Sequence, residues 1–291
     1  MDLQSVAFEN APRTAWHRLC NYDEGGALVF SRNGLGGAMP RCSATAISHA
    51  IAAGVDGLDV DLHRDAQGNW VVLDEPQLDH QSDGIGLIGE LEPEKWRQIH
   101  LGWTDENGFG FGFDERIVDL NRLLEVIDHK AILCLRLHGG TVQDYEQLTD
   151  TLVMAGWSDG IVYRLDAGTI GSLAALIEAP FFQSVPVMMS STAQQLEANP
   201  QLADLRVHAH EVSFQHFTEL YKALSICRTK KARVCVNAGH IEERFGATDL
   251  QYRRALWRSL LDAGASILTT RDVLPVLRAC EDWGLHKRKN L

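Results

Sequence analysis

The chain has 291 residues, a formal net charge of −12 and a sequence pI near 5.4. Its hydrophobic content of 45% and charged content of 23% are ordinary for a globular protein with a sizeable core. The acidic balance argues against a nucleic-acid partner and against electrostatic adhesion to an anionic membrane. No stretch approaches the ~20 consecutive apolar residues that cross a bilayer, so we expect no membrane span.

The six cysteines are widely spaced and form no Cys-x-x-Cys pair. This usage fits a reducing compartment better than a disulfide framework. The first residues, MDLQSVAFENAPRTAW, contain neither a basic start nor an apolar run, so they do not resemble a secretory signal. We therefore expect a cytoplasmic protein.

The first half of the chain contains strand and helix patterns in alternation. Apolar runs predict strands at 27–31, 57–62 and 70–73, the last as a hairpin extension after the turn at 65–68. An amphipathic helix is predicted over 43–53, with Ser43 as its N-cap and Gly54 just past its end. The segment 76–116 is rich in glycine and polar residues and has one helical piece, 93–99. We interpret it as an insertion.

The run GFGFGF at 108–113 lies within this insertion. We interpret it as a loop that packs aromatic side chains onto its surroundings. A substrate lid is the alternative, because long loops often carry function.

From residue 118 onward the alternation is regular. Helices are predicted at 119–128, 142–155, 169–177, 193–197, 217–227, 252–263 and 272–283, and strands at 131–137, 161–165, 185–190, 207–214, 233–237 and 266–270. About eight βα units predict a parallel sheet that closes into a single (β/α)8 TIM barrel over 27–291. Residues 1–26 would be an N-terminal arm or helix that covers the barrel floor, and 76–116 an insertion after the second strand unit.

Polar residues follow three of the early strands. They are Ser31-Arg32-Asn33 after the first, Asp59 and Asp61 within the second, and Asp74-Glu75 after the hairpin strand. A parallel barrel builds its site from such residues at the carboxyl ends of its strands. We therefore expect a site at that face.

These same positions resemble the glycerophosphodiester phosphodiesterase family, whose opening motifs read roughly His-Arg-Gly, Pro-Glu-Asn-Thr, Gly-Ala-Asp, Glu-x-Asp, Lys-Asp-Gly and Val-Val-x-His-Asp. The matching segments here are Ser31-Arg32-Asn33, Pro40-Arg41-Cys42-Ser43, Gly54-Val55-Asp56, Asp59-Val60-Asp61, Asp65-Ala66-Gln67-Gly68 and Val71-Val72-Leu73-Asp74-Glu75. Weaker matches follow at 117–120, 132–138, 233–237 and 264–270, so the resemblance runs from about 27 to 277. It implies the TIM-barrel fold and phosphodiester hydrolysis.

The resemblance also implies what the site should contain. The family uses two histidines as general acid and base, and here Ser31 and Asp74 occupy those positions. Its divalent metal is held by the acids of Glu-x-Asp, which match Asp59 and Asp61, and by an acid on the third barrel strand, which matches Arg136. His138 replaces the family's lysine, and Arg32 matches its phosphate-binding arginine.

Arg136 changes the expected electrostatics of the site. A guanidinium ~4 Å from a divalent ion would cost roughly 8 kcal/mol at an effective dielectric of ~20. We expect Arg136 to pair directly with Asp59 and Asp61 in place of the metal. No cofactor is therefore expected, with Mg²⁺ or Ca²⁺ held by Asp59 and Asp61 only if the site is active.

Two sets of candidate residues follow. Arg32, Arg136 and His138 are candidates for binding a phosphate or another anion, and a structural ion-pair network is the alternative for them. Asp74, Glu75 and His138 are candidates for acid–base chemistry, with Ser31 a weaker candidate nucleophile. The spacing of His208, His210 and His216 is not a zinc motif. Arg164, Glu211, Asn237 and Arg271 end strands and are candidates to line the barrel mouth, and rim hydrogen bonds explain them at least as well as a function.

Three functions fit these observations. The first is a degenerate relative of the phosphodiesterases, a pseudoenzyme that keeps an anion-lined pocket and binds a small phosphorylated or anionic ligand. The second is an active phosphoric diester hydrolase with rewired acid–base residues. The third is an unrelated reaction on the same barrel, because a fold alone does not fix function. The oligomeric state is left open.

Overall fold

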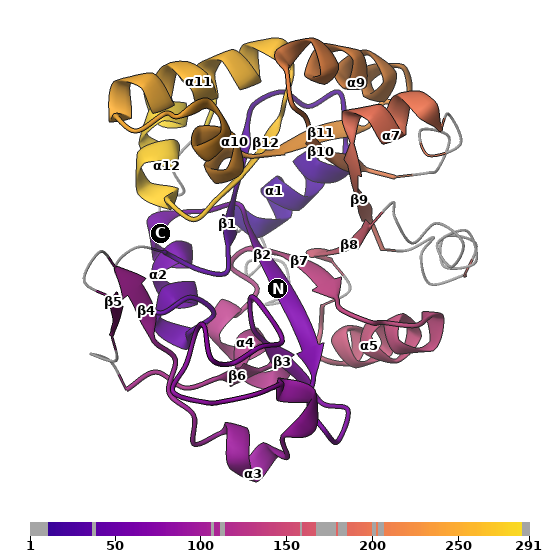
Figure 1. Ribbon diagram of the computed structural model, residues 1–291. Helices are drawn as coiled ribbons and strands as arrows, with labels where there is room; N and C mark the ends of the chain where they lie inside the picture. Colours follow the sequence, from indigo (N-terminus) through magenta and orange to yellow (C-terminus); the bar gives the residue numbers. More distant parts are fainter. Residues whose placement is uncertain are drawn as a thin grey trace, which may run out of the picture.

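The computed structural model describes residues 11–36, 39–105, 108–110, 114–157, 159–166, 179, 185–199, 202 and 207–286. Within these ranges eight parallel strands pair side by side in the order β1-β12-β11-β10-β9-β8-β7-β2, and β1 also pairs with β2, which closes the barrel (Figure 1). The strands are β1 (Leu28–Arg32), β2 (Gly57–Arg64), β7 (Ile132–Leu137), β8 (Ile161–Asp166), β9 (Val187–Thr192), β10 (Ala209–Ser213), β11 (Arg233–Asn237) and β12 (Ile267–Thr270). The predicted (β/α)8 barrel is confirmed.

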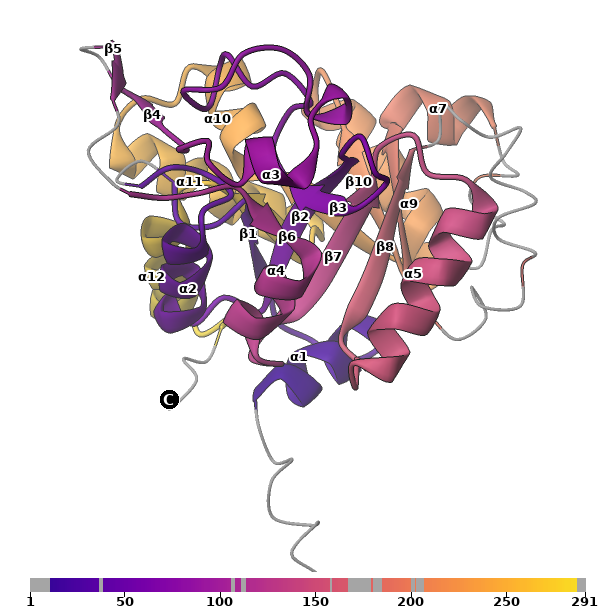
Figure 2. The ribbon, with the colours of Figure 1, turned by 90° about the horizontal axis from the view of Figure 1, so that it is seen from below.

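Helices surround this barrel (Figure 2). They are α2 (Ala44–Ala53), α4 (Leu120–Ile127), α5 (Val142–Met154), α7 (Ala193–Ala198), α9 (Phe217–Thr229), α10 (Ala238–Phe245), α11 (Leu250–Ala263) and α12 (Val273–Asp282). The predicted caps of α2 are confirmed: the Ser43 hydroxyl accepts from the Ala46 amide at 3.1 Å, and Gly54 ends the helix in the left-handed region. The predicted helix at 169–177 lies outside the described residues, and α10 was missed.

Side chains alternate between the inside of the barrel and its helix-covered outside. Inward residues of seven of the eight barrel strands, all but β2, form an interior apolar cluster, and intervening residues belong to the outer cluster that includes the helices. The interior cluster contains Leu28, Phe30, Ile132, Cys134, Val162, Met188, Ala209, Cys235 and Ile267. A packed apolar layer therefore fills the lower part of the barrel, as in other TIM barrels.

A helix from the N-terminal arm closes this layer from below. It is α1 (Ala11–Cys20), which lies below the barrel strands (Figure 2). Its Ala15 and Leu19 belong to the interior cluster. Both side chains are almost fully buried. This placement agrees with an N-terminal arm over the barrel floor, and the arm as a separate unit over residues 1–26 stays a prediction.

The segment after β2 extends the sheet on one side. β3 (Trp70–Val72) pairs antiparallel with β2 as predicted, and β6 (Val118–Asp119) pairs with β3. Between them lie the 3-10 turn η1 (Ile88–Glu90) and α3 (Pro93–Trp96), which is shorter than the predicted 93–99 helix. A separate apolar cluster, which includes Leu78, Ile88 and Trp96, holds this segment together.

The predicted loop at 108–113 is partly wrong. Residues 108–110 form the strand β5 (Gly108–Gly110), which pairs antiparallel with β4 (Trp103–Asp105). An alternation of glycine and phenylalanine has the period of two that a strand requires, which explains the error. Residues 111–113 lie outside the described ranges. Among the helices that the structure describes, none combines the length and the apolar character needed to cross a membrane.

Candidate functional site

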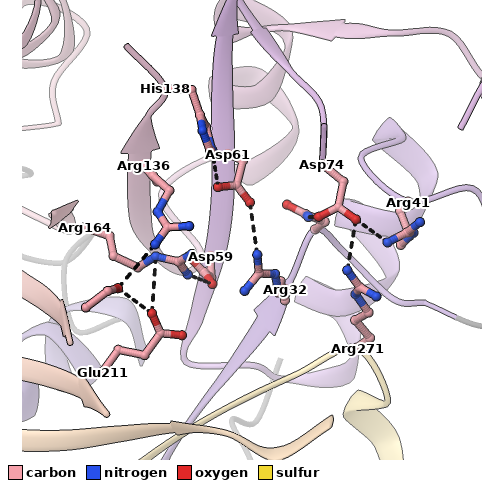
Figure 3. A network of polar contacts seen from close by, with 12 residues as sticks. Arg32, Arg41, Asp59, Asp61, Asp74, Arg136, His138, Arg164, Glu211 and Arg271 are labelled. Carbon is pink, nitrogen blue, oxygen red and sulfur yellow. Dashed lines mark hydrogen bonds and ion pairs between the residues drawn. The ribbon is translucent and has the colours of Figure 1, made fainter. Parts of the chain in front are cut away.

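A layer of charged side chains lies directly above the interior apolar layer. On β1, β7, β8 and β10 it occupies the inward position two residues beyond the last member of the apolar cluster, and on β2 it includes two inward residues. Figure 3 shows its members, which come from β1, β2, β7, β8 and β10: Arg32, Asp59, Asp61, Arg136, Arg164 and Glu211. The predicted location of the site at the carboxyl face is consistent with this placement.

Arg164 on β8 is at the centre of this layer. Its Nη1 donates to Oδ2 of Asp59, and its Nε lies 3.6 Å from Oε2 of Glu211. Arg164 and Asp59 side chains are both only 1% exposed. Although burial lowers the pKa of Arg164, the carboxylates of Asp59 and Glu211 outweigh it and raise that pKa, so the guanidinium stays charged. We refer to Asp59, Arg164 and Glu211 as the inner network.

The expected pairing of Arg136 with Asp59 and Asp61 is wrong. Arg136 instead lies 3.5 Å from the Ser190 hydroxyl and 4.0 Å from Oδ2 of Asp166. The cation that pairs with the barrel aspartate comes from the next strand, at Arg164. Both arginines occupy inward positions near the ends of their strands, so the sequence pattern alone does not distinguish them. Arg136 is therefore weakly partnered and 23% exposed at the edge of the layer.

Asp61 makes the second group of contacts in the layer. Its Oδ1 contacts Nε2 of His138 at 2.8 Å, and its Oδ2 lies 3.6 Å from Nη2 of Arg32. Burial would raise the pKa of Asp61, but the hydrogen bond with His138 and the guanidinium groups of Arg164 and Arg32 lower it to about 2. Asp61 is thus a fixed carboxylate, and it orients a His138 ring that is 39% exposed.

A histidine that the sequence did not single out lies beside His138. The rings of His63 and His138 stack with centroids 4.3 Å apart and planes 12° apart. Burial, and secondly the nearby His138, lower the pKa of His63 to about 4, so His63 is neutral near pH 7. His63 continues the inward alternation of β2 after Asp59 and Asp61, which is the signal that could have identified it.

Asp74 is held outside the inner network. Its carboxylate accepts from Arg41, from Nη2 of Arg271 at 2.9 Å and from Nδ2 of Asn33 at 2.6 Å (Figure 3). We refer to Asp74, Arg41, Arg271 and Asn33 as the outer network. It ties together the segments that follow β1, β3 and β12. The oxygens of Asp74 are committed to these donors, which leaves little capacity for proton exchange with a ligand.

Two other candidates lie apart from the layer. Ser31 follows the outward alternation of Val29 on β1, so its buried hydroxyl points to the helix side of the strand. The Glu75 side chain is exposed and lies 3.3 Å from Nδ1 of His80, while its backbone carbonyl accepts from Nε2 of Gln81. Of the residues predicted for acid–base chemistry, the structure therefore brings only His138 to the inner layer.

The donor set does not fit a divalent cation. Asp59 and Asp61 each keep one buried oxygen without a hydrogen bond, but the guanidinium groups of Arg164 and Arg32 already occupy the surrounding space. Across the described parts of the chain, no three His, Cys, Asp or Glu side chains are grouped so that they could hold a metal ion. A bound ion would have to displace Arg164 or lie beside a fixed positive charge.

A cavity of ≈ 420 Å³ opens beside the layer. Arg136, Ser190 and Glu211 form its inner edge, and residues of β9, β10, β11 and α10 form its wall. This volume lies within the ~300–1,000 Å³ range of small-molecule sites. The Ser190 hydroxyl donates to Oε2 of Glu211 at 2.5 Å and thereby links this edge to the inner network.

Comparisons with known proteins agree with the sequence motifs. No family model matches the chain. A curated glycerophosphodiester phosphodiesterase from Caldanaerobacter subterraneus subsp. tengcongensis is 26% identical over 130 residues. The match covers 44% of this chain and 51% of that protein, so the chain spans about half the length of the curated relative it matches.

Solved structures show the same fold. A glycerophosphoryl diester phosphodiesterase from Parabacteroides distasonis superposes with a TM-score of 0.76 at 12% identity, covering 97% of this chain and 95% of that one. A glycerophosphodiester phosphodiesterase from Agrobacterium tumefaciens gives 0.63 at 17% identity and covers 86% and 99%. A phosphodiesterase from Oleispira antarctica, in complex with the product sn-glycerol-3-phosphate, gives 0.66 at 15% identity and covers 88% and 97%. The resemblance to the glycerophosphodiester phosphodiesterase family is confirmed.

Proposed function

We propose that this relative of the glycerophosphodiester phosphodiesterases binds a small phosphorylated or anionic ligand at the barrel mouth, without metal-dependent phosphodiester hydrolysis. The observation that carries the proposal is the position of Arg164, buried between Asp59 and Glu211. This permanent cation takes the electrostatic role that a divalent ion would have between barrel carboxylates. We also keep the prediction of a cytoplasmic protein.

The remaining cations of the layer are available to a ligand. Arg32 and Arg136 approach carboxylates only at 3.6 and 4.0 Å, beyond normal hydrogen-bond distance, and the buried Nε of Arg32 has no hydrogen-bond partner in the described structure. A phosphate group would give both guanidinium groups charge-assisted hydrogen bonds. The 39% exposed His138 lies on the same layer and can add a donor. The phosphorylated product in the Oleispira antarctica structure supports this class of ligand.

A second function is favoured by one specific contact. The 2.8 Å contact between Asp61 and Nε2 of His138 fixes the ring, as a carboxylate does for a catalytic histidine. In an active phosphodiesterase with rewired residues, His138 would be the general base or acid. The imidazole that stacks on His138 is that of His63, whose burial lowers its pKa to about 4, so it is not charged to act as an acid near pH 7. For this reason the enzymatic role is the alternative.

Calorimetric titration with sn-glycerol-3-phosphate tests the binding proposal. The wild type should bind, and Arg136→Gln and Arg32→Gln should each weaken binding at least tenfold, because each removes a charge-assisted bond worth ~1.5–3 kcal/mol. Arg122→Gln, which changes an exposed arginine on α4, is the matched control and should leave binding unchanged. No detectable binding by the wild type would contradict the proposal.

A turnover assay separates the two functions. Glycerophosphocholine with Mg²⁺ or Ca²⁺ should be hydrolysed at background rates. Turnover at about 1 s⁻¹ or faster that His138→Gln abolishes would replace the binding role with the enzymatic one.

A further inference from the structure

The cavity beside Arg136 has a wall whose chemistry the phosphate-binding proposal does not use. Beyond its inner edge, much of the wall is formed by hydroxyl, amide and imidazole side chains from three adjacent strands and two helices. They are Ser191, Thr192, Gln195, Ser213, Asn237 and His240. The Asp166 carboxylate also lines the cavity, 4.0 Å from Nη2 of Arg136. The anion-binding edge and this polar wall face one cavity, so one ligand can contact both.

Several groups on this wall have hydrogen-bonding capacity to spare. Asn237 uses its Oδ1 to cap α10 at the His240 amide, at 3.0 Å, and its Nδ2 makes no bond to the described residues. Gln195 uses its Oε1 at the Thr192 amide, at 2.7 Å, and its Nε2 likewise has no partner there. Backbone caps thus fix both amides and leave both NH₂ groups free.

Acceptors line the same cavity. Glu211 uses only Oε2 for its contacts with Ser190 and Arg164, so Oε1 remains an acceptor at the inner edge. The Ser213 hydroxyl has no hydrogen bond to any described residue, and a hydroxyl can donate and accept. Fixed NH₂ donors, a carboxylate oxygen and a hydroxyl around one cavity match a ligand with several neighbouring hydroxyl groups.

The same wall disfavours other head groups. Among the described residues that line the cavity there is no Phe, Tyr or Trp. A nucleobase would lack a stacking surface, and a quaternary ammonium group would lack the aromatic faces that recognise it. The only apolar side chains on the lining are Val212 and Ile241. An extended acyl chain would therefore find little surface to cover.

We propose that the ligand is a sugar phosphate, with its phosphate on Arg136 and its hydroxyl groups on Asn237, Gln195, Ser213 and Glu211. This inference rests on the proposed anion-binding function. The ≈ 420 Å³ cavity accommodates a pentose or hexose ring, whereas a three-carbon glycerol phosphate on the same anion site would leave much of the polar wall unused.

Competition calorimetry with a ligand panel tests the inference. The probes are inorganic phosphate, sn-glycerol-3-phosphate, phosphocholine, ribose 5-phosphate and glucose 6-phosphate. At least one of the two sugar phosphates should bind tenfold or more tightly than sn-glycerol-3-phosphate and phosphocholine. Equal affinity across the panel, or tighter binding of phosphocholine, would overturn the inference while leaving the anion site intact.

Variants of the wall make the two proposals separable. Asn237→Ser retains an N-cap residue for α10 and removes the NH₂ donor, and Ser213→Ala removes one exposed hydroxyl. Each should lower sugar-phosphate affinity three- to tenfold and leave inorganic phosphate affinity unchanged. Ser259→Ala on α11, whose hydroxyl bonds only to the Ala255 carbonyl, is the control. Loss of phosphate affinity in Arg136→Gln, together with lower sugar-phosphate affinity and unchanged phosphate affinity in the wall variants, would show that both parts act as assigned. Unchanged sugar-phosphate affinity in both wall variants would refute the polyol wall.

Discussion

The inner and outer networks both join a carboxylate to arginine, yet they differ in burial. In the inner network Asp59 and Arg164 are each 1% exposed and lie inside the barrel above a packed apolar layer. In the outer network Asp74 is buried, but Arg271 is half exposed and connects loops. Removal of one partner from a buried pair leaves an uncompensated charge, whereas exposed pairs contribute little. The comparison teaches that similar ion pairs can be essential for stability inside the barrel and can merely connect loops at its rim.

Replacing Arg164 should give the largest effect. Arg164→Met leaves Asp59 and Glu211 buried without their cation, so the free energy of unfolding should fall by about 3–5 kcal/mol in urea denaturation. The double variant Asp59→Asn with Arg164→Met should recover part of this loss, because it removes one of the stranded charges. If Arg164→Met lowered the free energy of unfolding by less than about 1 kcal/mol, the inner network would contribute no more to stability than the outer one.

A lower pH should reduce the stability of the folded chain through His63, which stacks on His138 beside the charged layer. The pKa of His63 is lowered to about 4 in the folded chain, from an ordinary value near 6.5. Between these values the unfolded chain binds a proton that the folded chain does not, so this contribution to stability is complete above pH 6.5 and is lost as the pH falls toward 4. The pKa of Asp61, about 2, places its own loss lower, between about pH 4 and 2.

Urea denaturation at pH 7 and at pH 4.5 measures how the free energy of unfolding changes with pH. The wild type should lose stability on the order of 2 kcal/mol from His63 across this interval. His63→Phe keeps a ring to stack on His138 and should flatten the slope, whatever its effect on stability at pH 7. An unchanged slope in that variant would assign the pH dependence to other groups.

The smallest effect is expected in the outer network. Arg271→Gln removes a half-exposed cation, while Asp74 keeps Arg41 and Asn33 as donors. The free energy of unfolding should change by at most about 1 kcal/mol in the same urea assay. A loss comparable to that of Arg164→Met would erase the difference between the two networks.

The sequence predicted the barrel because strand and helix periods repeat along the chain, and the inward alternation of Asp59 and Asp61 is local to one strand. It did not predict which cation pairs with them. Arg136 and Arg164 have equivalent local patterns, and only the tilt and register of neighbouring strands place Arg164 between Asp59 and Glu211. The alignment with family motifs also put Ser31 at a histidine position without showing that its side chain points to the helices.

The polar wall as a whole could not be predicted from the sequence for the same reason. Ser213 and Asn237 are unremarkable strand-end residues, and Gln195 lies in a six-residue helix. Their convergence depends on three neighbouring strands that follow one another around the barrel. A single sequence contains no local signal for such long-range proximity.

The guanidinium at the centre of the barrel is covalently part of the chain, so its supply never depends on the surroundings. Under the proposed function, the positive charge of the site is in place as soon as the chain folds, and ligand binding would not change with chelators or with free magnesium and calcium. Its occupancy would then track the concentration of the ligand alone.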